Sequence, residues 1–315
     1  MQFADRLITA VRRVRNPVLV GIDPRPEDFP AGFLDRFPGD WSGVAAAIEA
    51  FGRGVVDVVA PLVAAVKFQA AFYEAYGPEG VAALHGTVRH ARQSGLIVLL
   101  DGKRNDIGST AEAYARAYLG KVPVGGRFEP AWNADALTVN PYLGSDGIAP
   151  FVTVAAREEK GLFVLVRTSN ASAGEFQDLV ANGRPLYRHV AERLAQWAAP
   201  QRGESGYSLV GAVVGATYPQ QLVELRAELP GVLFLVPGYG AQGGSAQDVA
   251  GAFDADGLGA LINNSRGLTS AYARPAYQAR FGDAWQRAIE QAVRGMIDDL
   301  AQNTGAGRLR AGDPA

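Results

Sequence analysis

The chain has 315 residues, of which 48% are apolar and 20% are charged, and its formal net charge is −2 at pH 7. This balance is typical of a globular protein and excludes a disordered or fibrous chain, while the small net charge offers no basic field for nucleic acid or a membrane surface. The chain contains no cysteine, which excludes disulfide frameworks, thiol nucleophiles and cysteine-ligated metals.

Short apolar, β-branched runs alternate along the chain with alanine-, leucine- and arginine-rich stretches of helical period. In chain order, the expected strands are residues 18–23, 62–68, 96–101, 136–140, 162–167, 209–214, 232–236 and 258–263. The expected helices lie near residues 42–60, 78–94, 108–119, 145–159, 185–199, 218–228, 245–253 and 271–301. Because the strands are almost continuously apolar, we expect a parallel sheet buried on both faces. Eight such units favour an α/β fold, a closed (β/α)8 TIM barrel, over an open doubly wound sheet.

A single domain is expected over residues 1–302, with long loops at 24–40, 120–133 and 170–184 and a flexible, disordered tail at 303–315. No stretch reaches the about 18 uninterrupted apolar residues of a membrane helix. The first residues lack the charged-then-apolar order of a signal peptide. We therefore expect a cytoplasmic protein that binds neither membranes nor nucleic acid.

Lysine is scarce in this chain: of 30 basic residues, only Lys67, Lys103, Lys121 and Lys160 are lysines. Arginine stays protonated and cannot donate a proton in a catalytic cycle, whereas lysine can. Chance or codon bias would scatter the lysines without pattern. Instead, Lys67 and Lys103 fall at the ends of predicted strands, where the chemistry of a TIM barrel is located.

Carboxylates accompany these two lysines. Asp101 and Lys103 are two residues apart, so strand periodicity places both on the side that faces the barrel mouth. Asp106 and Thr110 are four residues apart and share one face of the next predicted helix, although Asp106 could also serve only as its N-cap. The pattern predicts an alternating array of lysines and aspartates, and the alternative is a structural ion-pair network.

A phosphate site is predicted at the last two strand ends. The segment Pro237-Gly-Tyr-Gly-Ala-Gln242-Gly-Gly244 offers backbone N–H groups to an anion, and a helix starts near Ser245. Arg266 follows the last strand and adds a guanidinium group. TIM barrels commonly bind phosphate at these two loops, whereas the glycine loop alone could be a plain turn.

Metal and dinucleotide sites are not indicated. The three histidines, His85, His90 and His189, fall in predicted helices, and no cluster of histidine or carboxylate residues has metal-ligand spacing. No Gly-x-Gly-x-x-Gly motif follows the first strand, and no nucleophile elbow is present. The sequence therefore shows neither a metal-ligand pattern nor a dinucleotide fingerprint.

The segment Asp101-Gly-Lys103-Arg-Asn-Asp106-Ile-Gly-Ser-Thr110 resembles the Asp-x-Lys-x-x-Asp-Ile-x-x-Thr signature of the orotidine 5′-phosphate decarboxylase family. The resemblance extends over roughly residues 15 to 300 and includes, in order, Asp23, Lys67, Ser169, the glycine-rich loop and Arg266. The length of the chain is similar to that of the longer bacterial branch.

The resemblance implies a TIM barrel that forms a homodimer and converts orotidine 5′-monophosphate to uridine 5′-monophosphate (UMP) and CO2. This is the last step of de novo UMP synthesis, and the resemblance implies that it needs no metal or cofactor. It further implies that Lys103 donates a proton to C6 of the pyrimidine, and that Asp101 lies near the substrate carboxylate.

The same resemblance assigns the remaining residues of the site. It implies that Lys67 and Asp23 hold the ribose hydroxyls, with Lys67 also orienting Asp101. It implies that Asp106 and Thr110 reach into the partner's site. The resemblance also implies that Ser169 contacts the pyrimidine and that Gln242 and Arg266 grip the phosphate.

Two other functions remain open at this point. A Mg²⁺-dependent decarboxylase or aldolase of keto-sugar phosphates, from the same superfamily, shares the Asp-x-Lys-x-x-Asp pattern. The additional Lys67 and the Ile-x-x-Thr110 ending favour the nucleotide enzyme. The second alternative is a barrel that binds a nucleotide phosphate without catalysis.

Overall fold

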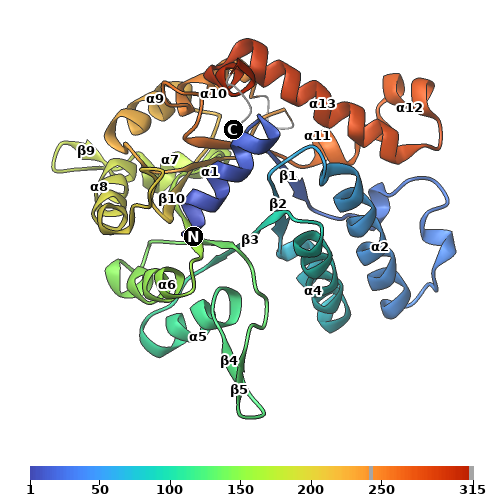
Figure 1. Cartoon of the computed structure of the whole chain (residues 1–315), viewed down its shortest axis with the longest axis horizontal. Coiled ribbons are helices and arrows are strands. Elements are labelled where there is room, and N and C mark those ends of the chain that lie inside the picture. Colours follow the sequence, from blue (N-terminus) through green and yellow to red (C-terminus); the bar gives the residue numbers. More distant parts are fainter. Residues whose placement is uncertain (241–243, 312–315) are drawn as a thin grey trace.

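Eight parallel strands close into a barrel in the computed structural model, which describes residues 1–240 and 244–311 (Figure 1). The strands are β1 (Val18–Ile22), β2 (Ala65–Gln69), β3 (Ile97–Arg104), β6 (Ala136–Val139), β7 (Gly161–Arg167), β10 (Val210–Val214), β11 (Phe234–Val236) and β12 (Ala260–Asn264). Their order around the barrel is β1-β12-β11-β10-β7-β6-β3-β2, and β2 pairs with β1 again. The predicted (β/α)8 fold is confirmed, and each barrel strand overlaps one expected strand, although β2 begins at Ala65 rather than at residue 62.

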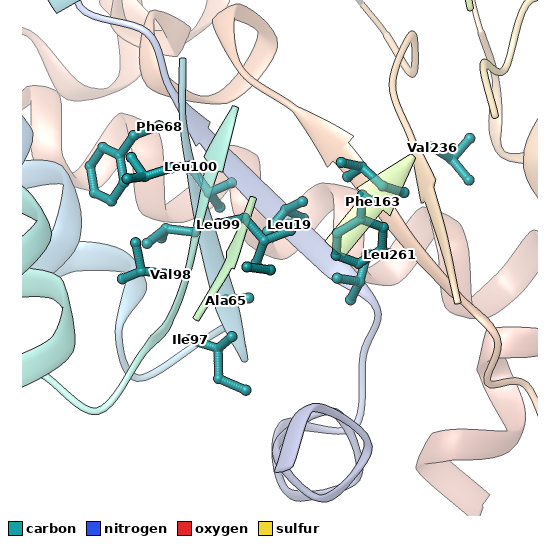
Figure 2. Packing of buried hydrophobic residues seen from close by; sticks show 14 of the residues in the cluster. Leu19, Ala65, Phe68, Ile97, Val98, Leu99, Leu100, Phe163, Val236 and Leu261 are labelled. Atoms are coloured by element: carbon teal, nitrogen blue, oxygen red, sulfur yellow. The ribbon is translucent and has the colours of Figure 1, made fainter. Parts of the chain in front are cut away.

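The barrel interior is filled by strand side chains rather than left open as a channel. Leu19, Leu99, Phe163 and Leu261, from four different strands, are all at most 1% exposed, and Figure 2 shows them close to one another. Strands buried on both faces need apolar residues at nearly every position, which explains the unbroken apolar runs of the sequence.

Helices surround the sheet, as the alternation of the sequence predicts. The longer ones are α2 (Trp41–Val59), α4 (Gly77–Gln93), α5 (Gly108–Tyr118), α6 (Ser145–Arg157), α8 (Leu186–Ala198), α9 (Pro219–Glu228) and α13 (Trp285–Asn303). The shorter ones are α3 (Ala71–Glu74), α7 (Gly174–Gln177), α10 (Ala246–Val249), α11 (Arg266–Thr269), α12 (Pro275–Phe281) and α14 (Arg308–Ala311). The expected helix at 271–301 is divided into a 3-10 turn, α12 and α13, because Pro275 starts a new helix and Gly282 adopts a φ of 53°.

The N-terminal helix and two hairpins lie outside the predicted alternation, as do the short helices α3, α7, α11 and α14. Helix α1 (Phe3–Val14) packs Phe3 against the first residue of β7, Gly161, and its ring lies 6.3 Å from that of Phe163, so α1 covers the N-terminal end of the barrel. The loop at 120–133 contains the hairpin β4 (Val122–Val124) and β5 (Arg127–Glu129), which projects away from the barrel (Figure 1). The loop at 170–184 contains α7 and part of the small hairpin β8 (Val180–Ala181) and β9 (Arg184–Pro185).

The long loop at 24–40 is anchored by aromatic rings. Phe29 stacks on Phe51 of α2 at 4.4 Å, and Phe51 in turn stacks on Trp285 of α13 at 5.3 Å. The hydroxyl of Tyr272 donates a hydrogen bond of 2.6 Å to the carbonyl of Asp28. These contacts hold the loop over one side of the barrel mouth.

The end of the chain is more ordered than the expected tail. Helix α13 continues to Asn303, a 3-10 turn covers Gly305–Gly307, and α14 follows. Ala306 is 2% exposed, and Arg308 donates to the carbonyl of Ala255 at 2.6 Å, so residues 303–311 pack on the barrel. Residues 312–315 lie outside the described part of the chain. No helix among the described residues is long and apolar enough to cross a membrane.

Candidate active site

A cavity of about 570 Å³ opens at the carboxyl ends of the barrel strands. In a TIM barrel this end carries the loops that bind substrate. Polar residues at or just after the ends of different strands line it: Asp23, Lys67, Gln69, Asp101, Lys103, Thr138, Thr168, Ser169, Asn170, Asn263, Asn264, Ser265 and Arg266. The cavity therefore brings together side chains from positions 23 to 266 that only closure of the barrel makes neighbours.

Asp101 is the centre of the polar cluster. Its Oδ2 lies 3.0 Å from the Lys67 ammonium, and its Oδ1 lies 2.8 Å from the Lys103 ammonium. Gln69 donates to Oδ2 at 3.0 Å and Thr138 donates to Oδ1 at 2.8 Å. Four donors fix the carboxylate, so it holds both lysines in place.

The charges of this cluster reinforce one another. Burial alone would raise the pKa of Asp101, but Lys67 and Lys103 outweigh it and hold that pKa far below its usual range. Burial likewise opposes the charged form of Lys67, yet Asp23 and Asp101 raise its pKa above the usual value. Asp101 and Lys67 are thus both ionised across the physiological pH range.

Lys103 has an unusual backbone. Its φ is 46°, a left-handed conformation that non-glycine residues seldom adopt, and the register between β3 and β6 shifts between Leu100 and Arg104. The Lys103 N–H donates to the Thr138 hydroxyl at 2.9 Å, which stabilises this conformation. The side chain is 45% exposed, so its ammonium reaches into the cavity mouth while Asp101 holds it.

Asp23 lies beside this cluster, with its Oδ1 3.8 Å from the Lys67 ammonium. This buried oxygen has no hydrogen-bond partner among the described residues, and neither do the side-chain oxygens of Asn263 and Asn264, which also line the cavity. Buried acceptors without donors are costly, and hydroxyl groups of a ligand would satisfy them.

Arg266 lines the same cavity, at the first residue of α11, directly after β12. Gly238 and Tyr239 of the glycine-rich loop line the same region, and the Tyr239 hydroxyl is bonded to Asp299 of α13. Ser245 begins α10 with a reciprocal capping box to Asp248. Gln242, predicted to bind phosphate, lies within 241–243, outside the described residues.

Two predicted residues do not reach the cavity of their own chain. Asp106 accepts a hydrogen bond of 2.8 Å from the Ile107 N–H, and Thr110 is exposed on α5. Ile107, not Asp106, is the N-cap of α5, and its side chain makes no capping bond, so the N-cap alternative for Asp106 is wrong. Neither Asp106 nor Thr110 lines the cavity.

A family model described as "Orotidine 5'-phosphate decarboxylase / HUMPS family" matches residues 18–280, which is most of the chain. The chain belongs to this family. The matched region contains every strand of the barrel and the whole polar cluster around Asp101.

Individual proteins named orotidine 5′-phosphate decarboxylase are similar along nearly the full chain. One from Rhodopirellula baltica is 47% identical over 305 residues, covering 95% of this chain and 99% of that protein. One from Caldicellulosiruptor bescii is 42% identical over 276 residues, covering 86% and 90% of the two chains.

Solved structures agree with these relatives. The structure of Leishmania donovani OMP decarboxylase superposes with a TM-score of 0.72 at 34% identity, over 96% of this chain and 99% of that one. Leishmania donovani UMP synthase gives 0.71 at 35% identity over 94% of this chain, which spans 57% of that longer protein.

The sequence patterns do not single out two residues that contact Asp101. Gln69 and Thr138 each donate to Asp101, but single polar residues within apolar strands carry no distinctive spacing. Thr138 is only 1% exposed, so its position next to β3 could have been recognised only from the strand order. A buried threonine in an otherwise apolar strand was the one available signal.

Proposed function

We propose that this chain catalyses the decarboxylation of orotidine 5′-monophosphate to UMP and CO2, the last step of de novo UMP synthesis, without metal or cofactor. The observation that carries the proposal is the clamped Lys67–Asp101–Lys103 cluster, which shares one cavity with Arg266. A cytoplasmic location belongs to the same proposal, because a chain without cysteine fits a reducing compartment.

The chemistry requires stabilisation of a carbanion. When the bond between C6 and the carboxylate breaks, CO2 leaves and the electron pair remains at C6 of the pyrimidine. The Lys103 ammonium, fixed at 2.8 Å from Asp101, supplies positive charge where the pair develops and then donates its proton to C6. Water afterwards returns a proton to the Lys103 amine, which restores the resting enzyme.

The other cavity residues bind the parts of the substrate that do not react. Asp23 and Lys67 hold the ribose hydroxyls, which would satisfy the buried Asp23 oxygen. Ser169 contacts the pyrimidine, and Arg266 together with Gln242 binds the phosphate. Phosphate binding far from the breaking bond aligns the ring, so it contributes to rate as well as to affinity.

A homodimer is part of the proposal, with Asp106 and Thr110 completing the site of the partner chain. Ile107, Tyr142 and Leu143 near the start of α5 and after β6 are 55%, 82% and 45% exposed, and exposed apolar side chains of this kind favour a protein interface. In the partner's site, Asp106 would add a second carboxylate beside Lys103.

The proposal is tested by following the ultraviolet absorbance of orotidine 5′-monophosphate in the presence of EDTA. We expect the purified chain to remove the substrate band and Lys103→Ala to abolish turnover while UMP binding remains measurable. Lys121→Ala, which removes a lysine that does not line the cavity, is the matched control and should keep full activity.

Two outcomes would contradict it. Turnover of a keto-sugar phosphate with added Mg²⁺, and none of the nucleotide, would assign the chain to the metal-dependent members of the superfamily. UMP binding without any turnover would leave a nucleotide-phosphate binder.

A further inference from the structure

Arg167, the last residue of β7, is a fully buried cation outside the cavity. Its side chain is among the largest in the chain with no exposed surface. Leu165 lines the cavity, and strand alternation alone would turn Arg167 the same way. The register with β10 shifts instead, pairing Val213 with Leu165 and Val214 with Arg167, and this bulge turns Arg167 toward the helices.

Two tyrosines and two helices enclose the guanidinium group. Its carbon lies 4.0 Å from the ring centre of Tyr218 and 5.4 Å from that of Tyr187, on α8. The Nε atom donates to Gln221 of α9 at 2.6 Å. A planar guanidinium can stack on rings and donate in several directions at once, which a lysine ammonium cannot do.

The remaining donors of Arg167 reach the end of α7, in the loop that follows β7. One terminal nitrogen donates to Gln177 Oε1 at 3.3 Å, and the other lies 3.1 Å from Asp178 Oδ1. Asp178 is 47% exposed and is the only carboxylate within ion-pair distance of Arg167 among the described residues. A buried cation is costly unless its donors are satisfied, so loop residues 177 and 178 are needed to satisfy it.

Gln177 connects Arg167 to Thr168 in the wall of the cavity. Its Oε1 accepts from the Thr168 N–H at 2.9 Å, and its Nε2 donates to the Thr168 hydroxyl at 2.7 Å. That hydroxyl donates to Asn170 at 2.6 Å, and Thr217 donates to the carbonyl of Ser169 at 3.5 Å. Residues 168–170 all line the cavity, although Arg167 does not.

We propose that Arg167 is a positioning residue for pyrimidine recognition, acting through Gln177 to fix the Thr168–Asn170 segment against the base. The inference rests on the proposed function, because it takes the cavity ligand to be a pyrimidine nucleotide. Arg167 contacts no ligand itself, and its effect on binding passes through two hydrogen bonds to Thr168.

The test compares a ligand with a base and a ligand without one. Gln177→Leu removes both bonds to Thr168 and leaves the buried arginine with Gln221 and Asp178. We expect the UMP dissociation constant to rise roughly tenfold, while that of ribose 5-phosphate changes less than about twofold. Arg167→Lys keeps the charge but loses the planar fork, and we expect the same selective loss.

A matched control comes from the same loop. Arg184→Gln removes an exposed ion pair between Arg184 and Glu192, 3.3 Å apart, without touching Arg167, and should leave both ligands bound as in the unmodified chain. Circular dichroism establishes that each variant is folded.

The outcomes separate this inference from the proposed function. An equal loss of affinity for both ligands in Gln177→Leu would indicate a merely structural role and overturn the inference, as would unchanged UMP affinity. Failure of the unmodified chain to bind UMP would instead overturn the proposed function, and the inference with it.

Discussion

Thr138 connects the backbone of Lys103 to the carboxylate of Asp101. Its hydroxyl donates to Asp101 at 2.8 Å and accepts from the Lys103 N–H at 2.9 Å. One buried hydroxyl therefore orients the carboxylate and also holds the left-handed backbone of the proposed proton donor. Preorganised charges of this kind lower a barrier only if they do not have to rearrange during the reaction.

Thr138→Val keeps the shape of this side chain and removes both hydrogen bonds. We expect kcat to fall at least about tenfold, while the KM for orotidine 5′-monophosphate changes little, because the bonds orient Lys103 and not the substrate. Steady-state kinetics measures the two constants. Thr87→Val, at a buried threonine in α4 that does not line the cavity, is the control, and an equal kcat loss there would refute the specific role.

Arg266 is expected to act on affinity more than Thr138 does. Removing a charged donor from a phosphate costs roughly 1.5–3 kcal/mol, so Arg266→Ala should raise KM by about ten- to a hundredfold. Some loss of kcat should follow, because phosphate binding helps to align the ring. Arg280→Ala on the exposed face of α12 is the control, and an unchanged KM in Arg266→Ala would exclude the phosphate role.

Helix α1 is joined to the barrel by a buried cluster at the end opposite the cavity. Asp135, just before β6, is 2% exposed and lies 3.0 Å from Arg6 of α1, 2.7 Å from Arg92 of α4 and 3.6 Å from Lys160. Burial lowers the pKa of Lys160 to about 8. Asp135 raises this pKa, but the positive charges of Arg92 and Arg6 lower it. This network attaches the N-terminal helix to the barrel, although burial of the charged Lys160 costs free energy.

The linkage sign follows from that lowered pKa. Between pH 8 and the usual lysine value near 10.5, the unfolded chain binds a proton that the folded chain does not, so stability rises with pH. From pH 7 to 9.5, Lys160 should add about 2 kcal/mol to the free energy of unfolding. The Lys160→Met variant should lack this increase in the free energy of unfolding, as measured by urea unfolding at both pH values. A parallel pH dependence in the two proteins would contradict this account.

The barrel as a single chain leaves the proposed site incomplete. Asp106 and Thr110 lie outside their own cavity, while the apolar side chains of Ile107, Tyr142 and Leu143 are exposed near them. A two-fold axis at this face would place each Asp106 toward the partner's Lys103 site, since a symmetric dimer uses one patch twice.

Mixing Lys103→Ala chains with Asp106→Ala chains tests this arrangement. Each mixed dimer regains one site with both residues intact, so random mixing should restore about a quarter of the unmodified activity. Each parent variant alone should stay nearly inactive. No recovery in a mixed dimer isolated by two affinity tags would show that Asp106 acts within its own chain.

The residue pattern of this sequence determined the fold and the main charges of the site. Strands buried on both faces must be apolar throughout, so eight separate apolar runs specify eight strands of a parallel barrel. The polar residues that end those runs, Asp23, Lys67, Asp101 and Arg266, then had to meet at one mouth. These features depend on local sequence, and the sequence predicts them.

Tertiary structure alone decided the features that depend on register and closure. The bulges that set the backbone of Lys103 and turn Arg167 outward arise from pairing between strands, and no single segment encodes them. Thr138 meets Asp101 only because β6 lies beside β3, and α1 closes the barrel only because Gly161 leaves room for Phe3. Such contacts join residues distant in sequence, so their physical cause is the packing of the whole barrel.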